Sequence, residues 1–451
     1  MMTIFYMTKL LRWRKALKIG ALLSIQAVLA QGQSTKPDSL LTEATLENVV
    51  RYAIRYQPLI QQSVIDEEVT QATIKGKLAD WYPQLNFLYS YQRNIQLQTS
   101  IIGGNPIKFG VNNTSAPQLY ATLNIFNRDV LLASKTASDV RTHAKQVTSS
   151  NKIDIAVNVT KAFYDVLATS QQIRVGQGDV VRLNQSLKTA YDQYAAGIVD
   201  KTDYKRSTIT LRNTQATLKA NQELLKYKLA YLKALMGYPP ANDLNIIYDT
   251  LQMENEIALD TLQSLEYTAR IDYKLLDTQR KLQEASLKYA KWSFLPTVSG
   301  YGYLISNYFN NNFSELYKTR YPNSYVGVNF LLPVFQGGKR NANISLQRWS
   351  LRRIDQDVIN FRNNVNAQYA QALAAYKGNL ITYLSLKENV SLAKEVYDVI
   401  QLQYKTGVKT YLEVITAETD LRNTRINYFN ALYQVLASKI DVQKALGQII
   451  Y

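Results

Sequence analysis

The distribution of apolar and polar residues divides the chain into helical stretches and alternating stretches. From about residue 45 to residue 80, apolar positions recur at three- and four-residue steps, which indicates helix. Pro58 interrupts this stretch, because proline lacks the backbone N–H that a helix interior needs and disfavours helical geometry in the residue before it. We therefore expect a short helix that ends near Tyr56 and a second helix that follows it.

Alternation with a period of two follows these helices. Between residues 84 and 101, apolar side chains occupy most odd positions and polar side chains occupy most even ones. This pattern predicts one long strand with an apolar face and a polar face. Gly103 and Gly104 end the predicted strand, and a polar loop comes next. We expect a second alternating strand at about residues 117–126.

The same alternation returns in the second half of the chain. It predicts strands at about residues 297–309 and 325–335, with a loop rich in Asn and Tyr between them. Strand ends loaded with Tyr and Phe, polar loops and a polar second face are typical of the wall of a membrane barrel. A soluble antiparallel sheet packed on one side is the alternative. Two hairpins form an incomplete sheet, so either interpretation requires partners.

Four long stretches that are almost free of Gly and Pro predict helices outside the strands. Their expected bounds are about residues 128–194, 201–236, 340–404 and 411–446. The first of these helices would span roughly 100 Å at ~1.5 Å per residue. That length exceeds the diameter of a compact globule, so we expect the helices to pack together as in a coiled coil.

Three short motifs recur along the chain at a constant offset of 210 residues. Chance identity does not hold one register over so long a stretch, so the chain is predicted to be a tandem duplication. We divide it into a first repeat at residues 31–240, a connector at 241–256 and a second repeat at 257–451. The paired motifs are Tyr194–Gly197 with Tyr404–Gly407, Leu211–Thr214 with Leu421–Thr424, and Lys233–Gly237 with Gln443–Gly447.

Gly197 and Gly407 each separate two of the predicted long helices. Glycine tolerates positive φ, so it suits a tight reversal of the chain between helices. Helix capping alone would explain both glycines. The repeated Tyr194 and Tyr404, three residues before each glycine, favour a shared packing or gating role.

Residues 1–30 have the features of a secretory signal peptide. A basic head precedes an apolar core at residues 19–29, and Val28–Ala30 is a plausible cleavage site. The apolar core is too short to cross the ~30 Å of bilayer hydrocarbon, which argues against a membrane anchor. We therefore expect an exported protein. The basic residues of the head are Lys9, Arg12, Arg14, Lys15 and Lys18.

Composition excludes several classes of chemistry. The chain has no Cys and a single His, His143, so thiol catalysis, disulfides and His or Cys metal clusters are not expected. His143 lies in a polar helical stretch, where a solvated surface position is expected. The formal net charge is +17, but the basic residues alternate with acids along the helices. A solvated helical surface explains this better than a nucleic-acid site. We expect no enzyme activity, cofactor, metal or nucleic-acid partner.

The order of these elements resembles that of the TolC family of outer-membrane efflux proteins. The resemblance covers essentially the whole chain after residue 30 and rests on the duplication, the order of helices and strands, and several motifs. One motif is Leu332-Pro333-Val334-Phe335-Gln336-Gly337-Gly338-Lys339, which looks like the family's segment leaving the second hairpin of a repeat. The first copy keeps Leu123–Phe126 but lacks the double glycine.

The resemblance implies a mixed α/β membrane protein that acts as a homotrimer. Each protomer would give four strands to one 12-stranded antiparallel β-barrel in the outer membrane, in contact with its lipid. The long helical hairpins would form an α-barrel that extends into the periplasm. Such a duct would passively conduct substrates from a periplasmic adaptor and an inner-membrane pump, in tripartite efflux or type I secretion. A positive lumen that favours anionic cargo is a further hypothesis.

The family also has a gate at the periplasmic tip of its helices. The matching positions here are Thr202 and Asp203 after Gly197, and Tyr404 and Lys409 around Gly407. The resemblance implies two links, from Tyr404 to Asp203 and from Lys409 to Thr202. Lys409 stands where the family's best-known member has Arg, so its link should be weaker, because Lys lacks the guanidinium fork.

Two further tip positions match the constricting carboxylates of that member. Glu413 falls at the outer one, and Thr416 replaces the inner one. A trimer would then have one carboxylate ring, which argues against strong cation binding at the entrance.

Simpler interpretations of these residues remain open. Asp203 would stabilise the first turn of its helix through the helix dipole. Lys409 and Glu413 would form a solvated i,i+4 pair. For the whole protein, the competing class is a structural or adhesive periplasmic coiled-coil protein with a soluble sheet domain.

Overall fold

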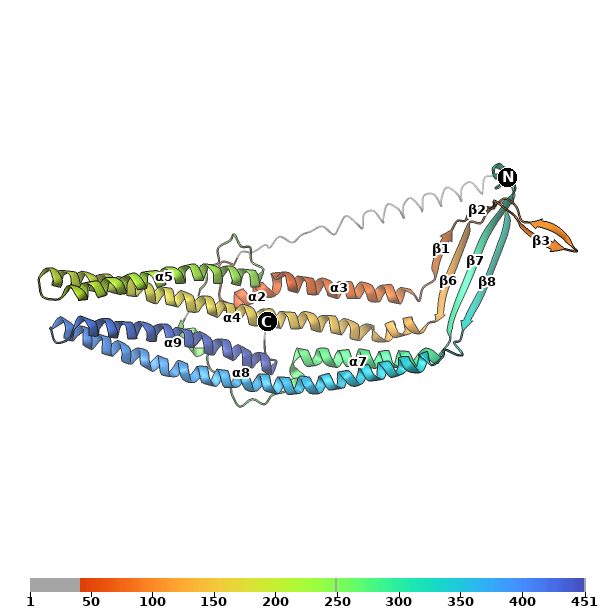
Figure 1. Ribbon diagram of the computed structural model, residues 1–451. Coiled ribbons are helices and arrows are strands. Elements are labelled where there is room, and N and C mark those ends of the chain that lie inside the picture. Colours follow the sequence, from red (N-terminus) through yellow and green to blue (C-terminus); the bar gives the residue numbers. More distant parts are fainter. Residues whose placement is uncertain (1–40, 248–249, 450–451) are drawn as a thin grey trace, which may run out of the picture.

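Two long helical hairpins lie side by side in the computed structural model, with a β-sheet at one end and the hairpin turns at the other (Figure 1). The structure describes residues 41–247 and 250–449. The expected signal peptide, residues 1–30, lies outside this part of the chain, as does most of the polar segment after it.

The long helices begin and end within one residue of the bounds expected from the sequence. The first hairpin consists of α4 (Arg128–Ala195) and α5 (Lys201–Met236). The second consists of α8 (Lys339–Lys405) and α9 (Tyr411–Leu446). Local caps fix these bounds, because the first N–H groups of a helix lack partners within it. Asn127, for example, accepts a hydrogen bond from the Asp129 N–H at 2.8 Å.

Shorter helices extend the hairpins toward the sheet. Helices α2 (Leu46–Tyr56) and α3 (Pro58–Ala79) meet at Gln57, as the position of Pro58 predicts. The second copy has α7 (Ile271–Lys291), to which we assigned no range from the sequence. The connector contains the short helix α6 (Thr250–Asn255).

We call α5 and α9, the second helices of the two hairpins, the return helices. Helix α3 lies end to end with α5, and α7 lies end to end with α9 (Figure 1). A glycine with positive φ ends each return helix, Gly237 at +68° and Gly447 at +73°. A Cβ at Gly237 would lie 2.9 Å from Pro58 Cδ, and one at Gly447 would lie 3.3 Å from Arg270 Cα. The absence of a side chain at both glycines therefore allows the two helix ends to meet closely.

The main core lies at mid-length, where α2, α4, α5, α8 and α9 meet the connector. Phe163 and Leu167 of α4 are fully buried there against Leu432 and Leu436 of α9. Burial of these side chains joins the two hairpins, because apolar area removed from water is the main favourable term in packing. None of the helices in the described ranges is long and apolar enough to cross a membrane.

The sheet joins the two repeats. Strands β1 (Gln84–Leu88), β6 (Gln118–Phe126), β7 (Thr297–Asn310) and β8 (Tyr321–Leu331) pair antiparallel in that order. The β6–β7 pair connects one repeat to the other. Within the chain, β1 and β8 are the outer strands of this four-strand order.

The prediction of a single strand at residues 84–101 was wrong. The segment is divided into β1, β2 (Tyr91–Arg93) and β3 (Gln98–Ile102). The first break lies opposite Ala116 and Pro117, where the facing strand is itself interrupted. Pro117 has no N–H, so its pair with Ser306 of β7 keeps only the hydrogen bond from the Ser306 N–H, at 2.9 Å. On the other side, Ser90 accepts a hydrogen bond from the Ala116 N–H at 2.9 Å.

The expected polar loop after Gly104 also contains strands, β4 (Asn105–Phe109) and β5 (Asn113–Ser115). Gly103 and Gly104 have φ of +61° and +85°, as a two-residue hairpin turn requires. They turn β3 back onto β4 instead of ending the sheet, and this hairpin projects beyond the other strands (Figure 1).

The strand expected at residues 325–335 is displaced toward the N-terminus. It runs from Tyr321 to Leu331, because its partner β7 supplies pairing from Asn307 back to Thr297. Pro296 and Pro333 flank the final pair of Thr297 with Leu331. Neither proline has an N–H to extend the ladder.

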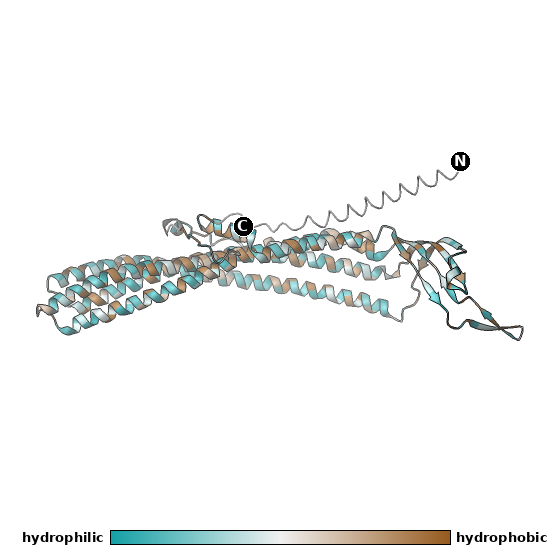
Figure 2. Ribbon diagram, turned by 90° about the horizontal axis from the view of Figure 1, so that it is seen from above, coloured by the Kyte–Doolittle hydropathy of each residue, from teal (hydrophilic) through white to brown (hydrophobic). Residues whose placement is uncertain are grey.

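The register places apolar and polar residues on opposite faces of the sheet, since cross-strand partners share a face. Phe87, Leu119 and Leu304 form one row of the apolar face, and Val326, Val328 and Phe330 of β8 lie on the same face. The exposed fractions of Phe87 and Val326 are 68% and 87%. The opposite face contains mainly Gln, Asn, Thr, Ser and Tyr side chains, and Figure 2 shows both kinds of residue along the strands.

Candidate functional site

The two tip turns have the same backbone hydrogen bonds. Gly197 donates to the Tyr194 carbonyl and Gly407 to the Tyr404 carbonyl, both at 3.0 Å. The residue after each glycine donates to the carbonyl of Gln193 or Gln403, both at 2.9 Å. The two glycines have φ of +72° and +80°, which glycine adopts without strain. A Cβ would meet nothing within 4 Å at either position, so the dihedral angle is the reason for glycine.

Each turn leads into a capped helix, but the caps differ. Asp200 accepts from the Thr202 N–H at 3.1 Å and caps α5. Thr410 and Glu413 form a capping box at the start of α9, in which each side chain accepts from the other's backbone N–H. Asp203 occupies the position in α5 that Glu413 occupies in α9, in the first turn of its helix. The position of Asp203 agrees with its simpler interpretation, in which it stabilises the N-terminus of its helix.

Tyr404 links the two hairpins, although not to the residue that the resemblance implies. Its hydroxyl donates to Gln193 Oε1 of α4 at 2.5 Å, and its ring centroid lies 5.7 Å from that of Tyr411. Asp203 is close enough to act on it electrostatically. Burial, and then the negative charge of Asp203, raise the pKa of Tyr404, against the hydrogen bond to Gln193. Within the described chain, Gln193 therefore takes the place of Asp203 as the hydrogen-bond acceptor.

Lys409 pairs with Glu413 and not with Thr202 within the chain. The distance from Lys409 Nζ to Glu413 Oε1 is 2.6 Å. Glu413 Oε2 also accepts from the Thr410 N–H at 2.9 Å and from the Thr410 hydroxyl at 3.0 Å. The hydrogen bond from Lys409, then the backbone bond from Thr410, lower the pKa of Glu413 to about 2. The i,i+4 pair foreseen as the alternative is thus present, and Thr202 and Thr416 are exposed.

A buried ionic cluster lies farther from the tip, and it was not predicted from the sequence. Asp179 and Arg182 of α4 form an ion pair, and Arg182 Nε lies 3.5 Å from Glu418 Oε1 of α9. Asp179 and Glu418 are only 1% and 5% exposed. Burial raises the pKa of the Glu418 carboxyl, against the attraction of Arg182. Glu418 lies on the same buried face of α9 as Ala417 and Leu421. An acidic residue among these apolar positions is the feature of the sequence that could have indicated the cluster.

Further polar contacts join α4 to α9 toward the middle of the molecule, so this pair of helices forms the main contact between the hairpins. One additional hydrogen bond joins α9 to α5, from Arg422 to Thr214 Oγ1 at 2.9 Å. The α4–α9 pairs are Gln172 with Asn430 at 2.9 Å, Lys161 with Asp441 at 2.5 Å and Lys444 with Asp154 at 2.7 Å.

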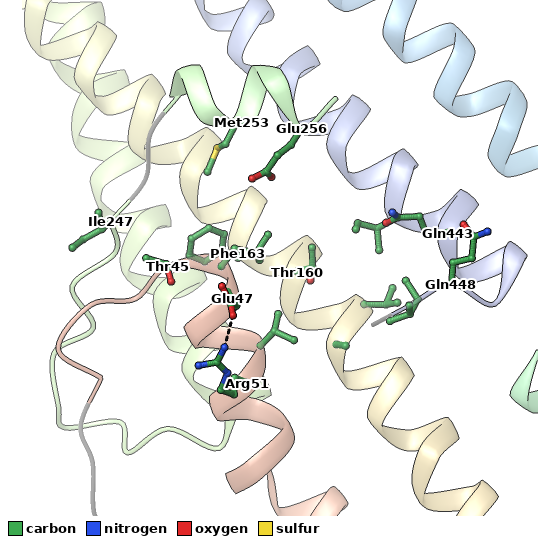
Figure 3. A pocket seen from close by; sticks show the side chains of 16 residues that line it. Thr45, Glu47, Arg51, Thr160, Phe163, Ile247, Met253, Glu256, Gln443 and Gln448 are labelled. Atoms are coloured by element: carbon green, nitrogen blue, oxygen red, sulfur yellow. Dashed lines mark hydrogen bonds and ion pairs between the residues drawn. The ribbon is translucent and has the colours of Figure 1, made fainter. Parts of the chain in front are cut away.

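A cavity of about 860 Å³ lies near mid-length, between α2, α4, α9 and the connector (Figure 3). Phe163 and Met253 contribute apolar surface to it, and Glu47 forms an ion pair with Arg51 at its wall. The described lining includes the carboxylates of Glu47 and Glu256 but no His. Over residues 41–247 and 250–449, no group of three or more His, Cys, Asp or Glu is placed to hold a metal ion.

His143 is half-buried, in contrast to the expected solvated position. It lines a small cavity with Ser63 and Asp66 of α3 and Leu282 of α7. The structure therefore places it in helix packing away from the tip.

Comparison with known proteins gives a consistent result. The model of the outer membrane efflux protein family matches residues 49–238 and 276–448. Outer membrane protein TolC of Escherichia coli K12 is 22% identical over 449 residues, which cover 93% of this chain and 85% of TolC. Outer membrane protein OprJ of Pseudomonas aeruginosa is 20% identical over 422 residues, covering 91% and 85%.

Solved structures share the fold. The crystal structure of the outer membrane protein VceC from Vibrio cholerae aligns with a TM-score of 0.72 at 15% identity, over 89% of this chain and 96% of VceC. The open state of the MtrE outer membrane channel of Neisseria gonorrhoeae aligns with a TM-score of 0.69 at 18% identity, over 89% and 88%.

Proposed function

The chain belongs to the outer membrane efflux protein family, and we propose that it is the passive exit duct of a tripartite efflux or type I secretion system. The observation that supports this most directly is the form of the sheet. None of the residues in β1, β6, β7 and β8 is charged, one face is apolar and exposed, and the other is polar. A wall between lipid and water has these properties.

The proposed working unit is a homotrimer. Strands β1 and β8 end the four-strand order within one chain, and open strand edges are not tolerated in hydrocarbon. Three copies that pair β1 with β8 of a neighbour would close a 12-stranded antiparallel barrel in the outer membrane. The helical hairpins would then enclose a tunnel in the periplasm, with α4 and α9 as the joint between neighbouring hairpins.

The tip is the proposed docking end for a periplasmic adaptor, which connects the duct to an inner-membrane pump. Ile198 and Val408, next to the two tip glycines, are 72% and 71% exposed. Apolar side chains at such exposure favour contact with another protein.

The proposed gate is the contact between the two hairpins at this tip. Tyr404 bonds from α8 to Gln193 of α4, so separating the hairpins like an iris breaks this bond. Asp203 lies near Tyr404, while Thr202, Lys409 and Glu413 lie at the starts of the return helices. Opening keeps the turns intact, because in the described part of the chain the N–H groups of Gly197 and Gly407 donate within their own hairpins.

Single-channel conductance of purified protein in planar bilayers tests both the duct and the gate. Tyr404→Phe removes the hydroxyl that bonds to Gln193, so we expect more frequent or larger openings than in the wild type. Tyr194→Phe is the matched control at the equivalent position of the first repeat. No hydrogen bond of the Tyr194 hydroxyl is recorded in the described chain, so its conductance should equal that of the wild type.

Two outcomes contradict the proposal at different levels. Equal conductance of Tyr404→Phe and Tyr194→Phe would reject the gate and leave the duct standing. A protein that stays monomeric and dissolved without detergent, and forms no channel, would instead support the structural or adhesive coiled-coil class.

A further inference from the structure

Tyrosine side chains form a stacked row across three neighbouring strands. The register places Tyr120 of β6, Tyr303 of β7 and Tyr325 of β8 directly beside one another on the polar face. The ring centroids of Tyr120 and Tyr303 are 5.5 Å apart with an interplanar angle of 16°. Those of Tyr303 and Tyr325 are 5.1 Å apart at 22°. Such nearly parallel stacking holds each ring in place through its neighbour. We call these three residues the tyrosine row.

A fourth tyrosine supports the row from the side. Tyr301 faces Gly327 in the register, and a Cβ at Gly327 would lie 2.5 Å from Tyr301 Cζ. The missing side chain therefore leaves the space that the Tyr301 ring occupies. From there the ring meets Tyr303 and Tyr325 edge-on, at centroid distances of 5.9 Å and 6.3 Å. Gly327 thus allows the aromatic group to assemble on this face.

The row is open at both ends. Asn86 of β1 holds the next position beside Tyr120, and its exposed side chain is much smaller than a phenol ring. Tyr325 lies on β8, at the other end of the four-strand order, and is 45% exposed. The outer faces of the two terminal rings are therefore not covered by a further ring of the row. A planar group of matching size would extend the stack there.

The surroundings of the row are polar but uncharged. Gln118 and Thr122 flank Tyr120 on the same face, and Ser299 and Asn329 follow along β7 and β8. The four strands contain no Asp, Glu, Lys or Arg, although the whole chain has a formal charge of +17. At this level the wall has no charge to select anions, which argues against a lumen that favours anionic cargo through this stretch.

We propose that the tyrosine row is a contact site for aromatic rings of the cargo inside the duct. The proposal rests on the proposed function, because the polar face lines the lumen only in the trimeric barrel. A solute ring stacks on the open faces of Tyr120 and Tyr325, and the phenol hydroxyls supply neutral hydrogen-bond partners. Three copies of the row would lie at one level of the barrel, separated by the three copies of Asn86.

The test uses tryptophan and leucine as probes in planar bilayers. Both amino acids are neutral overall at pH 7, so the aromatic ring is the main difference between them. We expect tryptophan to reduce the open-channel current at concentrations where leucine has no effect. Replacing the row (Tyr120→Leu, Tyr303→Leu and Tyr325→Leu together) should raise the half-blocking concentration of tryptophan about tenfold.

The matched control replaces aromatic residues on the apolar face of the same sheet. Phe87→Leu with Phe330→Leu changes β1 and β8 without touching the polar face, and should leave the block unchanged. If the triple variant does not assemble, Tyr303→Leu alone removes the ring that contacts both other members of the row. We expect it to weaken the block in the same direction.

The possible failures are distinguishable. If the wild type forms no channel, the duct itself is wrong, and the row with it. If the channel forms but leucine and tryptophan block it equally, the aromatic contact is overturned. Equal block of the row variant and the apolar-face control by tryptophan overturns it as well.

Discussion

At the scale of single residues, Glu413 and Asp203 occupy equivalent positions of the two repeats, but their side chains make different contacts. Its carboxylate accepts from Lys409, from the Thr410 N–H and from the Thr410 hydroxyl. Both oxygens are therefore occupied at the start of α9. Asp203 is the equivalent acid in the first repeat. There the capping hydrogen bond is accepted by the N-cap residue Asp200, from the Thr202 N–H. The two turns have the same backbone hydrogen bonds, but different acidic side chains cap the helices that follow them.

The capping role of Glu413 predicts an acid-sensitive second tip. The pKa is about 2 in the folded chain against an ordinary 4.5, so the stabilisation is complete above 4.5 and is lost as pH falls toward 2. We expect Glu413→Gln to speed amide exchange over residues 410–414 about fivefold at pH 7. The difference from the wild type should vanish near pH 2. Hydrogen exchange corrected for intrinsic rates measures this.

The repeat supplies the control for that experiment. Asp203→Asn changes the equivalent acid of α5, for which the structure gives no capping bond, so exchange at the first tip should change much less. Equal acceleration at both tips would show that the helix dipole, and not the capping box, dominates.

At the scale of elements, the four long helices were predictable from the sequence and the first hairpin of the sheet was not. Long apolar stripes bounded by Gly and Pro determine α5 and α9 locally, through caps that lie within a few residues of the helix ends. The break between β1 and β2 lies opposite Ala116 and Pro117, which are more than twenty residues downstream and meet this segment only through strand pairing. Alternation alone contains no information about such a partner.

The candidate site divides in the same way. The turn glycines and the acids at the helix N-termini are local features, so their positions could be predicted from the sequence. The acceptor of Tyr404 is Gln193, 211 residues away, and the partner of Glu418 is Arg182 on another helix. Such pairs depend on how α4, α8 and α9 pack, and one sequence without relatives does not define that packing.

The α4–α9 contact includes a charge that costs stability. Glu418 is buried, and its Oε1 atom lies 3.5 Å from Arg182 Nε. Among the described residues, neither of these two atoms has a hydrogen-bond partner. Arg182 keeps Asp179 as its ion-pair partner. The folded-state pKa of Glu418 is raised, so ionisation at higher pH opposes folding. The charge weakens the contact between the hairpins, which separate in the proposed opening of the duct.

We therefore expect Glu418→Gln to raise the thermal midpoint at pH 8 by about 2 °C, because it removes a buried charge while Asp179 still neutralises Arg182. The gain should shrink as pH falls, since protonation removes the same charge in the wild type. Asp420→Asn, an exposed acid two residues farther along α9, is the control and should change little. A lower midpoint for Glu418→Gln at pH 8 would mean that the pair with Arg182 is net stabilising.

At the scale of the whole molecule, the proposed barrel requires a partner strand along the outer edges of β1 and β8. Leu85 of β1 and Val326 of β8 lie at the same level of the sheet, on its two outer strands. The pairs that connect them are Leu85 with Ala121, Ala121 with Gly302 and Gly302 with Val326. Three strand spacings of ~4.8 Å separate them within a chain, roughly 14 Å. A disulfide requires Cα atoms within about 7 Å, so these two positions cannot be bridged within one chain.

The natural absence of Cys makes this a clean test of trimer closure. Barrel closure staggers the register at the junction by several residues, because the strands tilt. A chain with Leu85→Cys and one further cysteine, placed in turn at every second position from Arg320 to Leu332, should form disulfide-linked dimers and trimers in detergent at one of these registers. Each single-cysteine variant is a control, because neither alone brings two thiols to the same edge. Chains that stay monomeric on non-reducing gels at every one of these positions would contradict the β1–β8 junction. In that case the exposed apolar face must be covered in another way, and neither the barrel nor a lumen lined by the tyrosine row would follow from the sheet.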